Sequence, residues 1–463
     1  MPKPLHRQGF QTTSLMRLFC VLTTLFSLAC TTYHAKTLNT QTVAQYNKTP
    51  SSDQLQMLAS HIKHSLLKPV VFELSDGLSP DEAAILAVLQ NKDLRLARNK
   101  LGIANAQLLQ AGLLPNPRLA YNIAGTTGGL DAGKVTGYGL SLDWEVTALL
   151  TQANRVSGAS AEQKSVNLQI AWQEWQVAQA AKLACYQWLV YAQQQALLED
   201  SLQRLTHNNE QLKIAVDKGL ITALESMSGV TAQTTLENRL EGVLAQKSLH
   251  QQRLNRALGR QPDESIPFQE TTALPEELTV SSYMQLTSNL SQQRLDLLAL
   301  QQGYQNQEQQ VHIAVLQQFP KISIGITHTK NNSDYYTMGA GISLSLPVFD
   351  QNQGAIALAK ANRQTLFDEY SNRDFQSKAD IAELLVTITS VNGEIKTSHT
   401  ALSSLETLLD AYDTASQQGQ IDRLVYYTAW SNVLDKKVDL LTLQLHLIEA
   451  QIALETATGR YSL

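Results

Sequence analysis

The chain has 463 residues, 43% of them hydrophobic, and its 36 basic and 41 acidic residues give a formal net charge of −5. The mean hydropathy of −0.18 excludes a protein made mostly of membrane-spanning helices, because each span needs about 20 consecutive apolar residues. The charge balance also lacks the basic excess of nucleic-acid-binding domains, so no nucleic-acid partner is predicted.

The N-terminal residues 1–29 predict an export signal peptide, because basic residues precede a short apolar run. The run ends in Ser-Leu-Ala-Cys, which resembles the lipidation motif of bacterial lipoproteins. This resemblance implies a lipid on Cys30 and sorting to the outer membrane. An ordinary signal peptide followed by an incidental cysteine is the alternative. The polar residues that follow, 30–78, are expected to form a tether.

The positions of the 12 prolines predict long helices. No proline lies between residues 118 and 261, and none follows Pro347. Because a proline inside a helix costs about 3 kcal/mol, these two stretches are free to form uninterrupted helices.

An internal duplication organises the chain. The segment Leu-Asn-Arg-Ala-Leu-Gly-Arg at 254–260 recurs as Leu-Glu-Thr-Ala-Thr-Gly-Arg at 454–460, and Gly219 recurs as Gly419. Ordered matches near one offset predict two copies of one structural unit. We therefore expect repeat 1 at residues 79–261, a connector at 262–281 and repeat 2 at 282–463.

Each copy has the same predicted order of elements. In repeat 1 a helix opens at Ser79-Pro80 and runs to residue 112, a β-hairpin follows, and a long helix covers residues 151–218. After the glycine turn, a return helix covers residues 221–258. The second long helix is expected at 351–418. A long helix of this length spans roughly 100 Å. The opening and return helices together have about the same length, so we expect them to stack end to end beside the long helix.

The two hairpins predict four strands with one apolar and one polar face, because apolar residues alternate with polar ones. The positions expected on the apolar face include Tyr121, Ile123, Tyr138, Leu140, Trp144, Ile322, Ile324, Ile342 and Leu344. This alternation is typical of a transmembrane barrel, whose smallest examples have eight strands, so several copies of the chain would have to share one barrel. A small soluble sheet capping a coiled coil is the alternative.

Three segments resemble the TolC-like outer-membrane efflux proteins. They are Ala-Gly-Leu-Leu-Pro-Asn-Pro at 111–117, Gly-Ile-Ser-Leu-Ser-Leu-Pro-Val-Phe-Asp at 341–350, and the two Gly-Arg repeat ends. The resemblance implies a mainly helical fold with a small β part: a homotrimer with a 12-stranded transmembrane barrel, four strands per protomer, above a helical tunnel through the periplasm. A periplasmic adaptor and an inner-membrane pump are the implied partners.

The resemblance also locates a periplasmic tip and gate at the turns of Gly219 and Gly419. Family members carry an acid six residues after each of these glycines, where this chain has Glu225 and Val425. Another acid often lies three residues further on in repeat 2, where Thr428 stands. Asp422 and Arg423 lie nearby. An acidic ring contributed by repeat 2 is therefore not predicted, and each charged residue here, taken singly, fits better as a solvated surface group.

No catalytic or cofactor motif is recognisable, so we predict neither an enzyme nor a cofactor. His61 and His64 have a spacing that can bind metal on a helix but lack partner ligands, which predicts no metal site. Cys185 is expected to be buried in a helix interface. A group of aromatic residues is expected to pack helices near the membrane or between protomers, namely Trp172, Trp175, Tyr186, Trp188 and Tyr191.

The functional hypothesis is a passive outer-membrane channel of a tripartite efflux system that lets drugs or metal ions leave the cell. A type I protein-secretion duct and a soluble periplasmic coiled-coil scaffold remain as alternatives. The tip hairpins would open by movement, and no chemistry in this chain would be required.

Overall fold

The computed structural model of the chain describes residues 32–48, 50, 52–60, 67, 76–129, 135–262, 264, 266–270, 272–418, 420, 421 and 423–461. The chain divides into two compact units, Met1–Pro50 and Ser51–Leu463. The first contains α2 (Thr40–Tyr46), whose N-cap Asn39 accepts a hydrogen bond from the Thr42 amide at 2.8 Å. The expected signal peptide, Cys30, His61 and His64 lie outside the described residues.

The second unit holds the other helices and strands, and these include the hairpins, long helices and return helices expected from the duplication. In the first half they are α3 (Ser52–Ser60), α4 (Pro80–Gln90), α5 (Lys92–Gly112), β1 (Arg118–Ala124), β2 (Gly137–Glu145), α6 (Ala148–Asp217) and α7 (Ala223–Ala257). In the second half they are α8 (Tyr283–Thr287), α9 (Leu290–Gln293), α10 (Leu295–Leu316), β3 (Ile322–Lys330), β4 (Tyr336–Leu344), α11 (Gln353–Gln417) and α12 (Arg423–Thr458). The two long helices, α6 and α11, have 70 and 65 residues, which confirms the prediction from the proline-free stretches.

The prediction of one continuous opening helix over residues 79–112 was wrong. The helix is broken at Asn91, whose ψ of 129° is extended and whose side-chain Oδ1 accepts hydrogen bonds from the amides of Asp93 and Leu94 at 2.9 and 3.0 Å. Asn91 thus caps a new helix, as asparagine does well because its short amide can reach the free N–H groups of the first turn. In the second half, α10 likewise begins after a break at Arg294.

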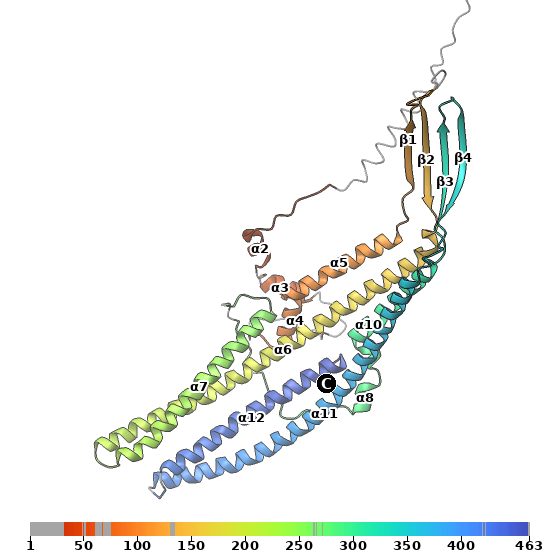
Figure 1. Cartoon of the computed structure of the whole chain (residues 1–463). Coiled ribbons are helices and arrows are strands. Elements are labelled where there is room, and N and C mark those ends of the chain that lie inside the picture. The colour runs from red at the N-terminus through yellow and green to blue at the C-terminus, as the bar shows by residue number, and fades with distance from the viewer. Residues whose placement is uncertain are drawn as a thin grey trace, which may run out of the picture. The chain divides into compact units, whose positions relative to one another are not determined.

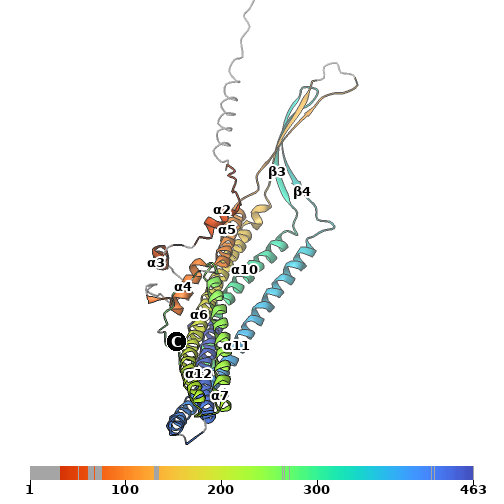
Figure 2. The same ribbon diagram turned by 90° about the vertical axis from the view of Figure 1, so that its left-hand side faces the viewer.

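Each long helix is flanked by two shorter ones. Helices α5 and α7 both pack along α6, and α10 and α12 both pack along α11 (Figure 1). Figures 1 and 2 show the sheet at one end of these helices and the α6–α7 and α11–α12 turns at the other. The side-chain Nδ2 of Asn91, at the start of α5, donates to the carbonyl of Ala257, at the end of α7, at 2.9 Å. The predicted end-to-end stacking is therefore confirmed.

The four strands form one antiparallel sheet in the order β1-β2-β3-β4, so the two hairpins lie side by side. The register places Leu142 opposite both Leu119 and Ile326, and Ile324 opposite both Trp144 and Ile342. Because residues directly opposite each other share a face, all nine apolar positions expected from the alternation lie on one face of the sheet.

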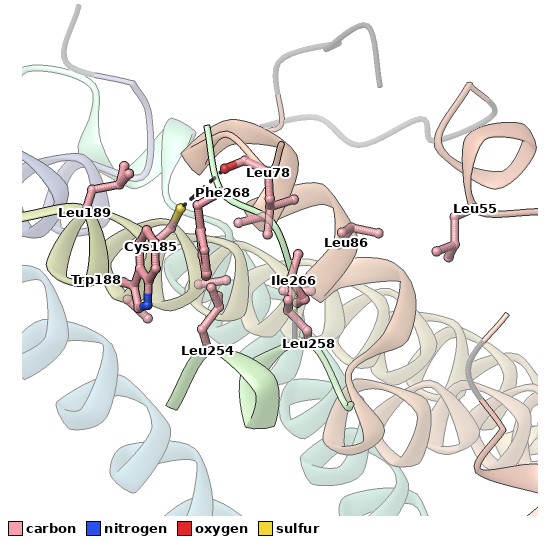
Figure 3. Close-up of a cluster of buried hydrophobic side chains, with 14 residues drawn as sticks. Leu55, Leu78, Leu86, Cys185, Trp188, Leu189, Leu254, Leu258, Ile266 and Phe268 are labelled. Carbon is pink, nitrogen blue, oxygen red and sulfur yellow. Dashed lines mark hydrogen bonds between the residues drawn. The ribbon is translucent and has the colours of Figure 1, made fainter. Parts of the chain in front are cut away.

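Cys185 is fully buried, as predicted, in a hydrophobic cluster that joins α4, α6 and the end of α7 (Figure 3). Its Sγ lies 3.9 Å from the carbonyl oxygen of Leu78. Burial, together with the nearby carboxylates of Glu82 and Asp81, raises the pKa of the thiol to about 12. The thiolate that would react is therefore scarcely present near neutral pH.

The expectation that the α6 aromatic residues pack near the membrane or between protomers was wrong. They pack within the chain and belong to different clusters: Trp175 is fully buried beside α4, α5 and α10, whereas Trp188 stacks on Phe268 with ring centroids 3.8 Å apart. Tyr191 stacks on His250 of α7 at 5.2 Å. No helix in the described part of the chain is both long and apolar enough to cross a membrane.

Candidate functional site

Aromatic side chains mark both ends of the apolar sheet face. Toward the hairpin loops, Tyr121, Tyr138, His328 and Tyr336 form a row with successive ring centroids 6.3, 6.0 and 6.2 Å apart. At the foot of the sheet, where strands pass into helices, the Nε1 of Trp144 donates to the Pro115 carbonyl at 2.9 Å. Aromatic residues with one polar end are typical of the two water interfaces of a membrane.

The apolar residues between these ends form a continuous band. Tyr138 and Trp144 are six residues apart on β2, which is about 20 Å of extended strand. The side chains in the band are exposed although they are large and apolar, with Ile342 at 72% and Ile326 at 48%. An outward apolar band about 25 Å tall between aromatic girdles is the pattern of outer-membrane barrels.

The opposite face of the sheet carries small and polar residues. A Cβ on Gly139 would collide with the amide of Asn122, and one on Gly325 with the carboxylate of Asp143. These two polar side chains therefore lie across the neighbouring strand instead of projecting from the sheet. The face consequently presents little side-chain volume, which suits the wall of a water-filled passage.

The outer edges of the sheet are the edges of β1 and β4. Within the described chain, β1 pairs only with β2 and β4 pairs only with β3. Each edge leaves a row of backbone groups available for pairing with another chain. In lipid such groups would each cost several kcal/mol if left unpaired.

At the other end of the helices, the repeat 1 turn is built on Gly219. Its φ of +69° is left-handed, and the amide of Leu220 donates back to the Ala215 carbonyl at 2.9 Å, which ends α6. Leu224 and Met227, in the first turns of α7, are 78% and 60% exposed. The tip of repeat 1 therefore exposes large apolar side chains beside the exposed Asp217 and Lys218.

The repeat 2 turn is described only in part. Gly419 and Asp422 lie outside the described residues, as do the side chains of Glu225 and Arg423. Val425 is 42% exposed, and the Thr428 hydroxyl donates to the Leu424 carbonyl of its own helix at 2.8 Å.

The two repeats are joined near the tips by apolar packing and one ion pair. Tyr427 and Leu434 of α12 are buried in a cluster with leucines of α6 and α7 that include Leu205. Beside this cluster, Arg239 of α7 forms an ion pair with Asp435 of α12. These contacts hold the repeat 1 hairpin against the return helix of repeat 2.

Farther from the tips the seam between α6 and α12 is polar. Side-chain amides on α6 form three bridges to α12: Gln179 to Glu455 at 3.0 Å, Gln187 to Glu449 at 2.9 Å and Gln194 to Thr442 at 3.2 Å. Hydrogen bonds of these kinds contribute about 1–3 kcal/mol each, and their directionality fixes the register of the two helices.

The repeat 1 end motif forms a joint with the break in the opening helix, which we call joint 1. Gly259 has φ +66°, and the Arg260 amide donates to the Asn255 carbonyl at 2.9 Å to close α7. A Cβ on Gly259 would lie 2.5 Å from the backbone carbonyl oxygen of Gln90. With the bond from Asn91 to Ala257, the end of α7 is locked onto the junction of α4 and α5.

The repeat 2 end motif forms the equivalent joint 2 at the start of α10. Gly459 has φ +68°, and the Nη1 of Arg294 donates to the Ala457 carbonyl at 2.8 Å. Arg294 also makes a bidentate pair with Asp296 at 2.9 and 2.7 Å and lies over the Trp172 ring of α6 at 4.8 Å. Arg373 of α11 lies 3.5 Å from the same carboxylate.

The duplicated Gly-Arg ends therefore have a structural role, because the glycine of each end locks a return helix onto a neighbouring helix. From the sequence they served only to align the two repeats. The detectable clue was the glycine itself, since a helix that ends in glycine uses the left-handed conformation that other residues avoid. Among the described residues, no group of three or more His, Cys, Asp or Glu side chains could hold a metal ion.

Comparison with known proteins identifies the fold. Residues 286–460 match the family described as outer membrane efflux protein. The chain is 25% identical over 402 residues to the cation efflux system protein CusC of Escherichia coli strain K12, covering 81% of this chain and 84% of that protein.

Solved structures share the same arrangement of long helices and strands. The CmeC outer membrane channel of Campylobacter jejuni has a TM-score of 0.69 at 14% identity and covers 93% of this chain and 94% of its own. The outer membrane protein VceC of Vibrio cholerae has a TM-score of 0.67 at 19% identity, covering 83% of this chain and 97% of its own. Residues 286–460 therefore match the outer membrane efflux protein family, and the chain as a whole shares the fold of the solved outer-membrane proteins CmeC and VceC.

Proposed function

We propose that three copies of this chain form one passive exit duct of a tripartite efflux system. The 12 strands close a barrel in the outer membrane, and the helices form a tunnel in the periplasm. The observation that carries the proposal is the sheet: its exposed apolar band fits lipid, while its two unpaired edges need strands from other copies.

The periplasmic entrance of this duct lies at the turns of Gly219 and Gly419, with Glu225, Asp422, Arg423, Val425 and Thr428 beside them. The apolar tip cluster and the pair between Arg239 and Asp435 keep the two hairpins of a protomer together. A periplasmic adaptor and an inner-membrane pump would bind at this end and move the hairpins apart. Cys30 would carry a lipid as a second hold on the membrane.

The proposed cargo is drugs or metal ions. Support for metal ions comes from the name of the relative CusC, a cation efflux system protein. The duct itself performs no catalytic step and needs no cofactor. Selection of cargo belongs to the pump, because a wide passage with small polar walls offers few contacts that distinguish one solute from another.

The proposal is tested by one pair of neighbouring substitutions on β3. Ile326→Arg places a charge in the apolar band, where it costs about 2–4 kcal/mol in lipid, whereas Thr327→Arg places the same charge on the polar face. We expect the unmodified protein and Thr327→Arg to run as trimers in detergent and to conduct in planar bilayers. Ile326→Arg should fail to insert.

A protein that stays monomeric and soluble after detergent removal, with no conductance, would contradict the duct. Equal behaviour of the two variants would contradict the assignment of the faces.

A further inference from the structure

The apolar face of the sheet is not flat at its foot. An open hollow of about 940 Å³ lies there, lined by two rows of residues that pair directly across β2, β3 and β4. The first row is Leu142, Ile326 and Ala340, and the second is Trp144, Ile324 and Ile342. Residues 114–117, which lead into β1, form one wall.

One lining residue of the hollow has a small side chain. Ala340 stands between larger residues, since Met338 and Ile342 are its neighbours on the same face of β4. A methyl group at this position leaves room that a larger side chain would fill. Ala340 is therefore the position at which a larger side chain would fill the hollow.

The chemistry of the hollow favours an apolar occupant. The indole N–H of Trp144 is already used by the Pro115 carbonyl, so it offers no free donor. The remaining side chains of the two rows are aliphatic. Only Asn116, which is exposed, brings a polar side chain to the wall. A hydrocarbon chain that ends in a polar group near Trp144 and Asn116 matches this distribution.

We propose that the hollow binds one acyl chain of a phospholipid from the periplasmic leaflet, with Trp144 beside the headgroup end of the chain. The inference rests on the proposed function, which puts this face in the membrane. The proposed site would bind one lipid at a defined position, whereas the rest of the apolar face would contact lipids without specificity. A neighbouring copy of the chain is a poorer occupant, because strands of another copy would pair at the edges of β1 and β4 and not on the face.

The test titrates the purified full chain, in detergent, with a phosphatidylcholine whose acyl chain carries bromine near its carboxyl end. Bromine quenches tryptophan emission on contact, and the contribution of Trp144 is obtained as the difference between the unmodified protein and Trp144→Phe. We expect the emission of Trp144 to fall as brominated lipid is added and to reach a plateau at one lipid per protomer. Ala340→Phe should fill the hollow and raise the half-saturating lipid concentration by at least about tenfold.

Met338→Phe is the matched control, because it adds the same ring on the same strand and face one row outside the hollow. It should leave the quenching unchanged. Quenching that rises linearly without saturation, or that is equal in the two variants, would overturn the lipid site. If quenching gives either of these results while the unmodified chain is trimeric and conducts, only the lipid site is contradicted. If the unmodified chain neither forms trimers nor conducts, the proposed function itself is contradicted.

Discussion

Joints 1 and 2 occupy equivalent places in the two repeats and are built with different chemistry. Both lock the end of a return helix, through a left-handed glycine, onto the start of a helix that leads to the sheet. Joint 1 uses a neutral amide, Asn91, whereas joint 2 uses the buried Arg294 with Asp296. The geometry of the joint is therefore what both repeats share, and each repeat secures it with a different side chain.

The difference follows from what surrounds each joint. Joint 1 connects elements of repeat 1 alone. Joint 2 touches two further helices, because Arg294 reaches Trp172 of α6 and shares its carboxylate partner with Arg373 of α11. An arginine has five donors and a planar face, so one side chain can serve all these contacts where an asparagine could not.

The largest expected effect comes from removing the cation of joint 2. Arg294→Gln should lower the free energy of unfolding by about 4 kcal/mol, because Asp296 would remain buried with only the more distant Arg373 as cationic partner. Denaturant titration in detergent, followed by tryptophan fluorescence, measures the change.

The control for this prediction is the double variant Arg294→Met with Asp296→Leu, which removes both charges. It should recover most of the loss, because a buried ion pair replaced by packed apolar side chains is often close to neutral. If the double variant is as unstable as the single one, the Ala457 bond and the Trp172 contact matter more than the charge pair.

A second comparison substitutes the two glycines. Gly259→Ala should cost about 3 kcal/mol, since it adds a clash with a backbone oxygen to the cost of the left-handed conformation. Gly459→Ala should cost only about 1–2 kcal/mol, because the nearest atoms, the Cγ and Cα of Arg294 at 3.0 and 3.1 Å, would have to move by only a few tenths of an ångström. Thermal unfolding of both variants side by side tests the order, and a reversed order would contradict the closer backbone approach at Gly259.

A smaller effect is expected at the cap of joint 1. Asn91→Ala loses the α5 cap and the bond to Ala257, about 1–2 kcal/mol together. Asn91→Asp keeps an acceptor for the α5 amides but cannot donate to the Ala257 carbonyl at neutral pH. Its stability, measured by the same thermal unfolding, should lie between those of the unmodified protein and Asn91→Ala. If Asn91→Asp is as stable as the unmodified protein, the bond to Ala257 contributes nothing.

The smallest effect is a pH dependence confined to repeat 1. Burial lowers the pKa of His250, with a further lowering by Arg253 and an opposing effect of Glu449. Because the folded state prefers the neutral ring, stability should be constant above the ordinary value of 6.5 and fall as the pH drops through it toward the lowered pKa. The equivalent position in repeat 2 is Ala450, which cannot titrate.

This slope is measured by repeating the unfolding titrations across a range of pH. His250→Phe keeps a ring to stack on Tyr191 and should remove the slope that His250 causes. A slope that is unchanged in His250→Phe would assign the acid sensitivity to other groups.

Much of the fold could be predicted from the sequence because its determinants are local. The long helices follow from the absence of proline, the strands from the alternation of apolar and polar residues, and the turn at Gly219 from a residue free to adopt positive φ. The face of each strand also follows, since the two-residue period fixes which side chains share it. For the same reason the nine apolar strand positions share one face of the sheet.

Tertiary structure alone decided what depends on partners far away in the chain. The bond from Asn91 at the helix break to the carbonyl of Ala257, and the cluster that each aromatic residue of α6 joins, depend on which helix lies beside them. The hollow at the foot of the sheet needs the β2–β3–β4 register to bring Ala340 beside Ile326 and Leu142. Local sequence sets the elements and their faces; contacts between residues of different elements set where those elements lock together and where they leave space.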